Sequence, residues 1–397
     1  MTNAEVRDTT EQYVLKTYGR RSLAFERGKG ALLYDVEGNE YLDFNSGLGV
    51  NALGHCHPVI VDLIRKQADR VIHTSNLYHV PSQAALAKKI CARCFGERVF
   101  FCNSGTEAVE GALKLARKRG RAIDELKTDI VAFGNSFHGR TLGALSATMQ
   151  EKYRKHFYPL LPGFAEAVFN DFTSVEKVAT DKTAAIIIEP LQGEGGVNVA
   201  DPVFMKQLES VCHERDILLI VDEVQCGMGR TGKLFAYEHY GITPDIMTLA
   251  KPIAGGLPIG AVVTGPRVWP VAEPGDHAST FGGNHFVTGV ACGVFDVLAD
   301  EAFLGDVADK GAYLESRLNE LAGKHPSIRE VRGKGLLMAI QVDFPASEAI
   351  DYFERNHILI CSAGPEVVRF IPPLIVSRGD IDRVIGLLDR FLGERSN

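Results

Sequence analysis

Between Ile217 and Gln225 the chain reads ILLIVDEVQ, in which five apolar residues end in an acid. A short apolar run of this kind predicts a buried strand with Asp222 at its carboxyl end. Residues 248–252 read TLAKP and predict a second strand end, which places Lys251 near the acid. In an open α/β sheet, ligands bind in the crevice at the carboxyl ends of the strands. The two motifs therefore predict a binding site that contains a carboxylate and a lysine.

This pair of groups has the chemistry that pyridoxal 5′-phosphate (PLP) requires. A carboxylate can hold a proton on the pyridine nitrogen, and a lysine amine can form a Schiff base with the aldehyde. The lysine must be neutral to react, which partial burial favours. A buried carboxylate such as Asp222 needs a partner, which is a pyridinium in a PLP enzyme and a salt bridge or helix cap otherwise. For Lys251 the alternative is an ordinary surface lysine, which its position before the glycine-rich residues 255–260 disfavours.

The composition is that of a globular protein with room for two domains. The chain has 397 residues, 45% hydrophobic and 23% charged, with a net charge of −7. We expect no nucleic-acid partner, because no block of basic residues is present. We expect no membrane partner and a cytoplasmic location, because no run of about 18 apolar residues occurs and Met1–Arg20 is polar. Cys91 and Cys94 lack the second ligand pair of a zinc site, so no metal is expected.

Strands and helices alternate through the middle of the chain, which predicts an α/β fold with a mostly parallel sheet. We expect the N-terminal segment, residues 1–57, to contain a hairpin around Asp35–Asn39 and to pack with a smaller α+β domain at 301–397. Residues 58–300 form the large domain. The predicted strands of the large domain are Val99–Cys102, Asp129–Phe133, Ala184–Glu189, Ile217–Asp222, Asp245–Leu249 and Gly260–Thr264, and its helices are Pro58–Arg70, Pro81–Phe95, Glu107–Arg119, Pro202–Arg215 and a stretch around Lys233–His239.

Two loops of small residues have the composition of phosphate-binding loops. Ser104, Gly105 and Thr106 lie between a predicted strand and a predicted helix, whose unpaired N–H groups attract anions. Ser279 and Thr280 belong to a second such loop, STFGGN. Taken alone, the first loop is better explained as an ordinary helix cap and the second as a plain surface loop; Asp222 and Lys251 favour phosphate binding by the first.

Further polar and aromatic residues follow other predicted strands. In the motif Phe137-His138-Gly139-Arg140, the aromatic ring can stack on a flat cofactor and the arginine can pair with a carboxylate. Glu194 lies between two glycines and can reach a cleft, whereas Arg369 lies on an apolar strand and needs an anion. The structural alternatives are a core phenylalanine, a surface arginine, a simple turn and an internal salt bridge.

In this order, the motifs NSGTE, FHGR, DEVQ, the lysine and STFGGN resemble the class III PLP-dependent aminotransferases over about residues 20–392. The resemblance is greatest to the subfamily that acts on acetylornithine, through the stretches YLDF, NALGH, HTSNLY and EPLQGEGG. It implies fold type I and a homodimer with shared active sites. It also implies these roles: phosphate contacts for Ser104, Gly105, Thr106 and, from the partner subunit, Thr280; ring contacts for Phe137, His138, Asp222, Val224 and Gln225; the covalent cofactor link for Lys251; substrate contacts for Arg140, Glu194, Ser279 and Arg369.

The activity that the resemblance implies belongs to arginine biosynthesis. The terminal amine of N-acetylornithine passes to 2-oxoglutarate and gives N-acetylglutamate semialdehyde and glutamate. Glu194 is expected to pair with Arg369 and to mask it in one half-reaction. The sequence leaves open ornithine, succinylornithine, 4-aminobutyrate or a lysine-pathway amine as the donor, an aminomutase of the glutamate-semialdehyde type, and a PLP-binding regulator without catalysis.

Overall fold

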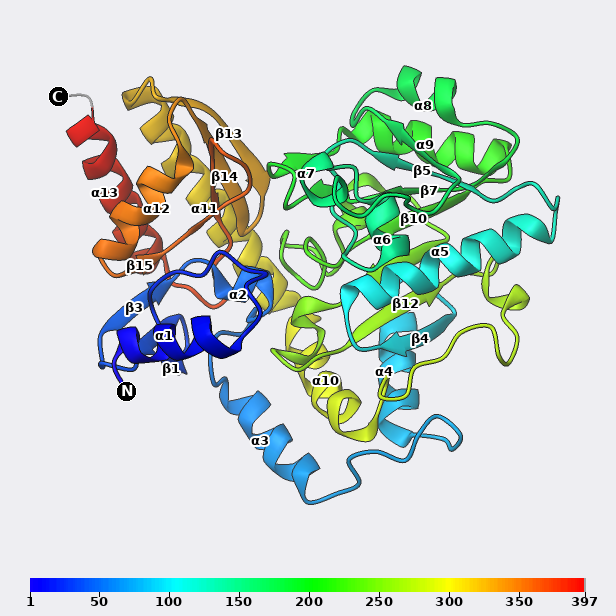
Figure 1. Cartoon of the computed structure of the whole chain (residues 1–397), viewed down its shortest axis with the longest axis horizontal. Helices are drawn as coiled ribbons and strands as arrows, with labels where there is room; N and C mark the ends of the chain where they lie inside the picture. Colours follow the sequence, from blue (N-terminus) through cyan, green and yellow to red (C-terminus); the bar gives the residue numbers. More distant parts are fainter. Residues whose placement is uncertain (396–397) are drawn as a thin grey trace.

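A seven-stranded sheet forms the centre of the larger of two lobes (Figure 1), in a computed structural model that describes residues 1–395. In spatial order its strands are β4 (Arg98–Cys102), β12 (Gly260–Thr264), β11 (Ile246–Leu249), β10 (Leu218–Asp222), β7 (Thr183–Ile188), β5 (Asp129–Phe133) and β6 (Phe164–Ala167). Neighbouring strands from β11 to β6 run parallel, whereas β12 is antiparallel to both of its neighbours. The predicted α/β fold with a mostly parallel sheet is confirmed.

Both faces of this sheet are covered, which explains why its central strands are apolar throughout. In β5, Ile130 and Ala132 belong to one buried cluster, and Val131 and Phe133 belong to another. Helix α5 (Gly105–Arg121) supplies the first cluster, whereas α9 (Pro202–Glu214) supplies the second with other elements. Alternate residues of a strand point to opposite faces, so the two helices lie on opposite sides of the sheet.

The strand order places the predicted site residues at one edge. Asp222 is the last residue of β10 and lies opposite Thr248 in the parallel β10–β11 register. Lys251 follows β11 after one residue and begins the short 3₁₀ helix η2 (Lys251–Ala254). The carboxylate and the lysine therefore reach the same edge from neighbouring strands, as the two sequence motifs predict.

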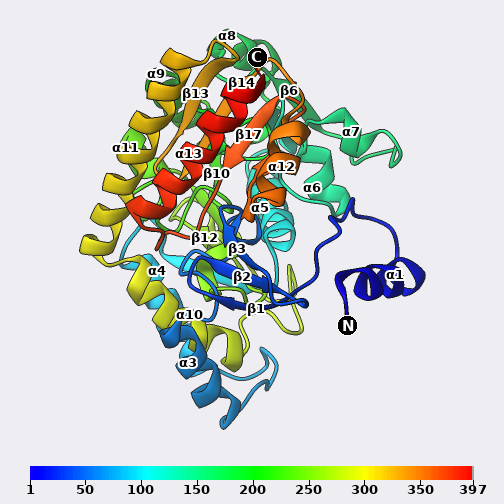
Figure 2. The ribbon, with the colours of Figure 1, turned by 90° about the vertical axis from the view of Figure 1, so that its left-hand side faces the viewer.

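Strands from both ends of the chain build the smaller lobe. One four-stranded sheet has the order β1 (Phe25–Lys29), β2 (Leu32–Asp35), β3 (Glu40–Asp43) and β15 (Ile358–Leu359), and the other has the order β13 (Ile328–Lys334), β14 (Leu337–Val342), β17 (Val367–Phe370) and β16 (Cys361–Ser362). Figure 2 looks onto the helices of this lobe, α11 (Glu301–Lys324), α12 (Ala346–Arg355) and α13 (Arg378–Arg395). Helices α11 and α12 pack on the second sheet, and α13 packs against both helices.

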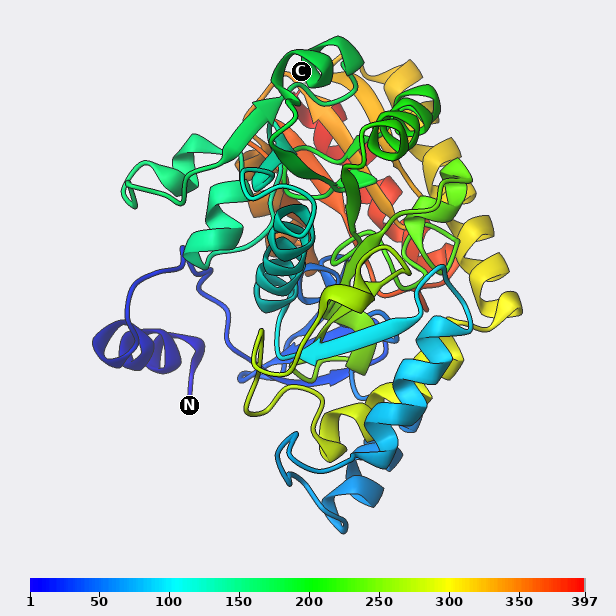
Figure 3. The ribbon, with the colours of Figure 1, turned by 90° about the vertical axis from the view of Figure 1, so that its right-hand side faces the viewer.

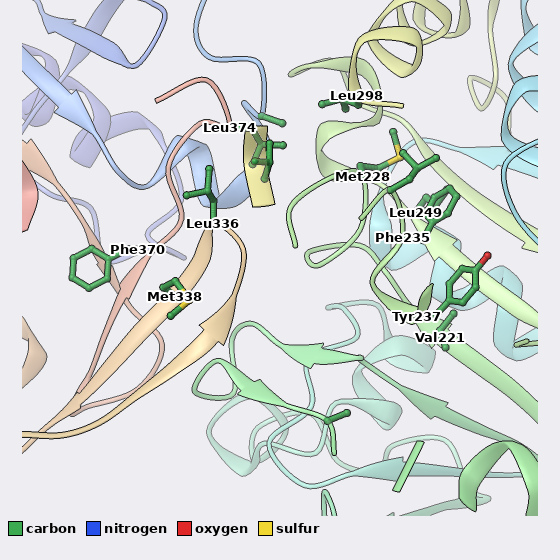
Figure 4. Close-up of a cluster of buried hydrophobic side chains, with 14 of the residues drawn as sticks. Val221, Met228, Phe235, Tyr237, Leu249, Leu298, Leu336, Met338, Phe370 and Leu374 are labelled. Carbon is green, nitrogen blue, oxygen red and sulfur yellow. The ribbon is translucent and has the colours of Figure 1, made fainter. Parts of the chain in front are cut away.

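The two lobes share buried apolar contacts. One cluster contains Met228 and Leu298 of the large lobe together with Leu336 and Leu374 of the small lobe (Figure 4). Beside it, the buried guanidinium of Arg230 donates from Nη1 to the carbonyl oxygens of Leu336 at 3.1 Å and Pro372 at 2.5 Å. These contacts fix the small lobe, and hence Arg369 on β17, relative to the sheet edge.

Several elements were not predicted from the sequence. Helix α1 (Asn3–Tyr13) has no buried residue and protrudes from the smaller lobe (Figures 2 and 3), to which Asn3 at its amino end is hydrogen-bonded through Asp35 and Glu37. Helix α10 (His285–Leu298) packs against α3 (Pro58–Ala68) and α4 (Pro81–Cys91). The helical stretch expected around Lys233–His239 was wrong, because only a 3₁₀ turn forms there, η1 (Ala236–Tyr240). The described residues also form α2 (Ser46–Gly49), α6 (Leu142–Ala147), α7 (Glu151–Arg154), α8 (Phe172–Val178), β8 (Leu191–Gln192), β9 (Asn198–Val199) and η3 (Trp269–Val271).

Within residues 1–395, none of the helices combines the length and the apolar character needed to cross a bilayer.

Candidate active site

A cavity of about 400 Å³ opens at the edge where β10 and β11 end. Eleven of the predicted site residues line it: Ser104, Gly105, Thr106, Phe137, His138, Arg140, Glu194, Asp222, Val224, Gln225 and Lys251. Arg369 lies behind the cavity wall, in contact with two of these residues, whereas Ser279 lies beside it. Thr280 is exposed and does not line the cavity.

Asp222 is buried, with a side chain that is 4% exposed, and three groups of the protein contact its carboxylate. Its Oδ1 accepts hydrogen bonds from the Thr248 hydroxyl at 2.9 Å and the Val224 backbone N–H at 3.1 Å. Its Oδ2 lies 2.7 Å from Nδ1 of His138. Burial opposes the charged imidazolium, but the hydrogen bond and charge of Asp222 prevail and raise the pKa of His138. The carboxylate is thus held in one orientation at the cavity floor.

Lys251 has an unusual backbone and a perturbed amine. Its φ is +41°, a left-handed conformation that costs a residue with a Cβ about 1–3 kcal/mol. Burial lowers the pKa of Lys251 from its ordinary value, against the opposing charge of Glu194. A lower pKa leaves a larger fraction of the amine neutral at a given pH, which is the form that attacks a carbonyl carbon.

The amino end of α5 forms another part of the wall. Within residues 1–395, the backbone N–H groups of Gly105 and Thr106 have no hydrogen-bond partner. The Ser104 hydroxyl caps the helix by accepting from the Glu107 N–H at 3.3 Å. A Cβ on Gly105 would lie 2.8 Å from Val224 Cγ1, so only glycine fits there. The helix end presents two free donors and a favourable dipole to an anion.

Phe137 and Val224 bring apolar side chains to the same cavity from two different loops. The Phe137 backbone N–H donates to Glu189 Oε2 at 3.0 Å, which holds its loop to the end of β7. Gly139 lies two residues further along this loop and has a φ of +141°. A Cβ at this position would lie 2.3 Å from Thr106 Oγ1. The loop that carries Phe137 is therefore pressed against the amino end of α5.

Glu194 and Arg369 form a salt bridge at the rear of the cavity. Nη1 of Arg369 lies 2.7 Å from Glu194 Oε1, and the arginine side chain is 1% exposed. The same Nη1 donates to the Gly193 carbonyl at 2.9 Å and to Gln225 Oε1 at 3.1 Å. Burial disfavours the Glu194 carboxylate, but the charge of Arg369 outweighs it and lowers the pKa of Glu194 to about 2. The predicted pairing of these two residues is observed.

Arg140 and Ser279 differ from Arg369 in their surroundings. The Arg140 guanidinium is exposed at the cavity mouth and, among the described residues, has no carboxylate partner. Ser279 Oγ accepts from Asn103 Nδ2 at 3.0 Å and from the Gly282 N–H at 3.0 Å. One arginine at the site is thus closed by an internal acid, and the other remains open to a ligand.

Two polar contributors to the site were not assigned a role from the sequence. Thr248 donates a hydrogen bond to Asp222 from the neighbouring strand. In the sequence it could be noticed only as a polar residue near the end of an apolar strand. Glu189 lines the cavity, and burial raises the pKa of Glu189 to about 7. Its only signal was its place at a predicted strand end, which Glu194 overshadowed because of its flanking glycines.

Comparison with known proteins agrees with this geometry. The family model described as "Aminotransferase class-III" matches residues 14–392. The acetylornithine aminotransferase of Gloeobacter violaceus is 47% identical over 97% of this chain and 96% of its own. Among solved structures, the N-acetylornithine aminotransferase of Stenotrophomonas maltophilia is 32% identical with a TM-score of 0.84, covering 98% of each chain. An ornithine aminotransferase of Toxoplasma gondii with partial occupancy of PLP at its active site is 35% identical with a TM-score of 0.95, covering 100% of this chain and 96% of its own. A match of this extent shows that the chain belongs to the class III, PLP-dependent aminotransferases.

Proposed function

We propose that the chain transfers the terminal amine of N-acetylornithine to 2-oxoglutarate, which gives N-acetylglutamate semialdehyde and glutamate, as a step of arginine biosynthesis. The observation that supports this choice of substrates is the presence of two different arginines at one cavity. Arg369 forms a salt bridge with Glu194, whereas Arg140 has no carboxylate partner among the described residues. Relatives named acetylornithine aminotransferase, 45–47% identical over almost the whole chain, support the same donor.

The residues around the cavity fit PLP. The free N–H groups of Gly105 and Thr106 suit its phosphate, together with the Ser104 hydroxyl. The Thr106 hydroxyl already accepts from the Arg140 and Thr141 N–H groups, so we assign the backbone of Thr106 to the phosphate. Phe137 and Val224 would cover the two faces of the ring, and Gln225 would lie near the ring hydroxyl. Bound PLP supplies a reactive aldehyde and a ring that withdraws electrons from the donor carbon.

The chain's own residues supply the proton transfers. Asp222, held by His138 and Thr248, would keep a proton on the pyridine nitrogen, because a carboxylate favours the charged form of a neighbouring base. Once the donor amine has displaced it, the neutral Lys251 amine would remove the proton from the donor carbon as a general base. The resulting ammonium would then act as a general acid and deliver that proton to C4′, the carbon of the cofactor's aldehyde group.

Two different substrates must use one site in turn. Acetylornithine presents an amine far from its carboxylate, which we assign to the open Arg140 at the mouth. Glutamate presents an amine next to its α-carboxylate, which we assign to Arg369 after Glu194 has moved aside. Ser279 lies beside Asn103 of the cavity wall and is proposed as a further substrate contact.

Single-turnover absorbance of the PLP-loaded protein tests the proposed function. Acetylornithine, ornithine and 4-aminobutyrate are added separately, and conversion of the cofactor to its pyridoxamine form is followed. We expect rapid conversion with acetylornithine and at least about tenfold slower conversion with the other two amines. Faster conversion with ornithine would transfer the assignment to that donor. Turnover without 2-oxoglutarate would instead indicate an aminomutase.

Replacing Glu194 with alanine is expected to change the ratio of the two half-reaction rates by about tenfold or more. The variant leaves Arg369 unmasked, so the half-reaction with acetylornithine slows while the half-reaction with glutamate keeps its arginine. The pKa of Glu194 near 2 keeps the pair charged at every pH above about 5, so the effect should not depend on pH between 6 and 9. Stopped-flow absorbance measures both rates.

The control for this variant is Asp343→Ala, which removes a carboxylate from an exposed pair with Arg329. It should leave both rates at the wild-type level. An unchanged ratio in Glu194→Ala would show that the acid does not act as a switch.

We also propose that two copies of the chain form a dimer with shared active sites. Large apolar side chains are exposed on the loop at residues 71–79, including Leu77 at 87% and Tyr78 at 71%. Asn76 Nδ2 ties this loop to the carbonyl oxygens of Ser279 and Gly282, on either side of Thr280. An exposed apolar patch of this kind is typical of a protein interface, and a second copy would bring Thr280 to the neighbouring phosphate site.

Replacing Leu77 with aspartate is therefore expected to convert the dimer into a monomer and to weaken PLP binding, because each site would lose its partner's Thr280. Sedimentation velocity reports the mass, and titration of cofactor absorbance reports the affinity. Val203→Asp, on the exposed face of α9, is the matched control and should remain dimeric. A Leu77→Asp variant that keeps the wild-type mass would rule out this face as the interface.

Two further expectations stay proposals. We propose that residues 1–57 and 301–397 form one discontinuous domain and residues 58–300 the other, supported by the pairing of β3 with β15. Amide hydrogen exchange at the same rate in the two terminal segments would agree with this division. We also propose a cytoplasmic location, which cell fractionation tests.

A further inference from the structure

Tyr153, on α7, contacts two residues that line the cavity. Its ring lies beneath Arg140, whose Cζ is 3.9 Å from the ring centroid. The same ring meets Phe137 edge to face, with centroids 5.6 Å apart and planes at 82°. Tyr153 thus contacts both the proposed ring-stacking residue and the open arginine.

Arg140 has few other side-chain contacts that fix its position. Its Cζ lies 5.2 Å from the Phe137 centroid, and no hydrogen bond from its guanidinium is formed to any described residue. Its backbone N–H is anchored to Thr106 Oγ1 at 3.1 Å, but a long side chain on a fixed backbone still has several rotatable bonds. A cation over an aromatic face is attracted by the ring quadrupole, which restricts where the guanidinium can lie.

We infer that Tyr153 is a positioning residue that holds the Arg140 guanidinium at the cavity mouth, where it binds the carboxylate of the amine donor. The inference rests on the proposed function, in which Arg140 meets that carboxylate. An internal acid would neutralise the arginine and compete with the substrate, as Glu194 does at Arg369. An aromatic ring orients the arginine and leaves its N–H donors free for a bidentate contact.

The chemistry of the ring predicts which variants matter. The Tyr153 hydroxyl makes no hydrogen bond with any described residue, so Tyr153→Phe should keep the function of the wild type. Tyr153→Leu removes the ring and retains an apolar side chain. It should lower the rate constant at low substrate, kcat/KM, for acetylornithine about 3- to 10-fold, mainly through KM.

A matched pair of substrates separates positioning from general damage. N-acetylputrescine is acetylornithine without the carboxylate, so its reaction does not use the proposed Arg140 contact. Single-turnover rates with both amines give the preference for the carboxylate. We expect Tyr153→Leu to reduce this preference about 3- to 10-fold and Tyr153→Phe to retain it.

Two controls complete the experiment. Phe157→Leu removes an exposed aromatic ring from the same segment, and Lys152→Ala removes the other cation over the Tyr153 ring, whose Nζ lies 4.7 Å from the centroid. Both should keep the wild-type preference. A wild-type preference in Tyr153→Leu, or a loss in Tyr153→Phe as large as that in Tyr153→Leu, would overturn the inference. Failure of wild type with acetylornithine would instead reject the proposed donor, and the comparison would then use the carboxylated amine that reacts and its decarboxylated analogue.

Discussion

Replacing Lys251 with alanine is expected to lower the transamination rate by at least about 10⁴-fold, because one amine serves as nucleophile and as proton carrier. The described residues offer no neighbouring amine that could take over the role of Lys251. Lys251 follows β11 in a left-handed conformation with φ of +41°, and burial lowers its pKa. Among residues 1–395, no other lysine lines the cavity. Steady-state assays with acetylornithine and 2-oxoglutarate measure the loss.

The covalent role of Lys251 has an independent readout. Borohydride reduction of the PLP-loaded protein, followed by peptide mass spectrometry, should place the cofactor on the peptide that contains Lys251. The remaining lysines in the same digest serve as the internal control. Labelling of another lysine, or a Lys251→Ala variant with more than about one hundredth of wild-type activity, would contradict the assignment.

Replacing Asp222 with asparagine is expected to lower the rate about 10²- to 10³-fold while PLP still binds. The variant keeps the shape of the side chain and its contact with the Thr248 hydroxyl, but it loses the negative charge. Without that charge, the proton on the pyridine nitrogen is no longer favoured, and the ring withdraws electrons less strongly. Single-turnover rates report the chemical step, and cofactor absorbance reports binding.

A second buried aspartate in the same sheet provides the control. Asp245 lies immediately before β11, at the opposite edge of the sheet, and forms a salt bridge with Arg267 at 2.9 Å. Asp245→Asn should lower thermal stability and leave the single-turnover rate within about twofold. An equal loss of rate in both variants would mean that the effect of Asp222→Asn reflects general destabilisation and not the ring nitrogen.

The site residues could be predicted because strand ends are visible in the sequence. Asp222 and Lys251 each follow an apolar run, and parallel strands bring such ends to one edge. Their partners were less visible. Thr248 and Asp222 meet through the register of two strands, and the Arg140–Tyr153 contact depends on how α7 packs. Sequence spacing carries neither kind of information.

The same limit explains the elements that the sequence missed. Helix α10 buries Val287, Val290, Ala291, Val294 and Leu298 at helical spacing, but the apolar residues Phe286, Cys292 and Val297 lie off this stripe and obscure the period in the sequence. By contrast, α9 has one buried face and was predicted within one residue of its end. The two-residue strands β8 and β9 are too short for a period of two to appear.

The pairing of β3 with β15 determines the order in which the protein can be assembled on the ribosome. Leu42 pairs with Ile358, so a strand made among the first fifty residues waits for a partner made among the last forty. The large lobe has all seven strands of its sheet once Thr264 has emerged, whereas β3 remains without this neighbour. Arg369 lies on the same late segment, so the proposed contact with the α-carboxylate of glutamate is the last part of the site that the ribosome makes.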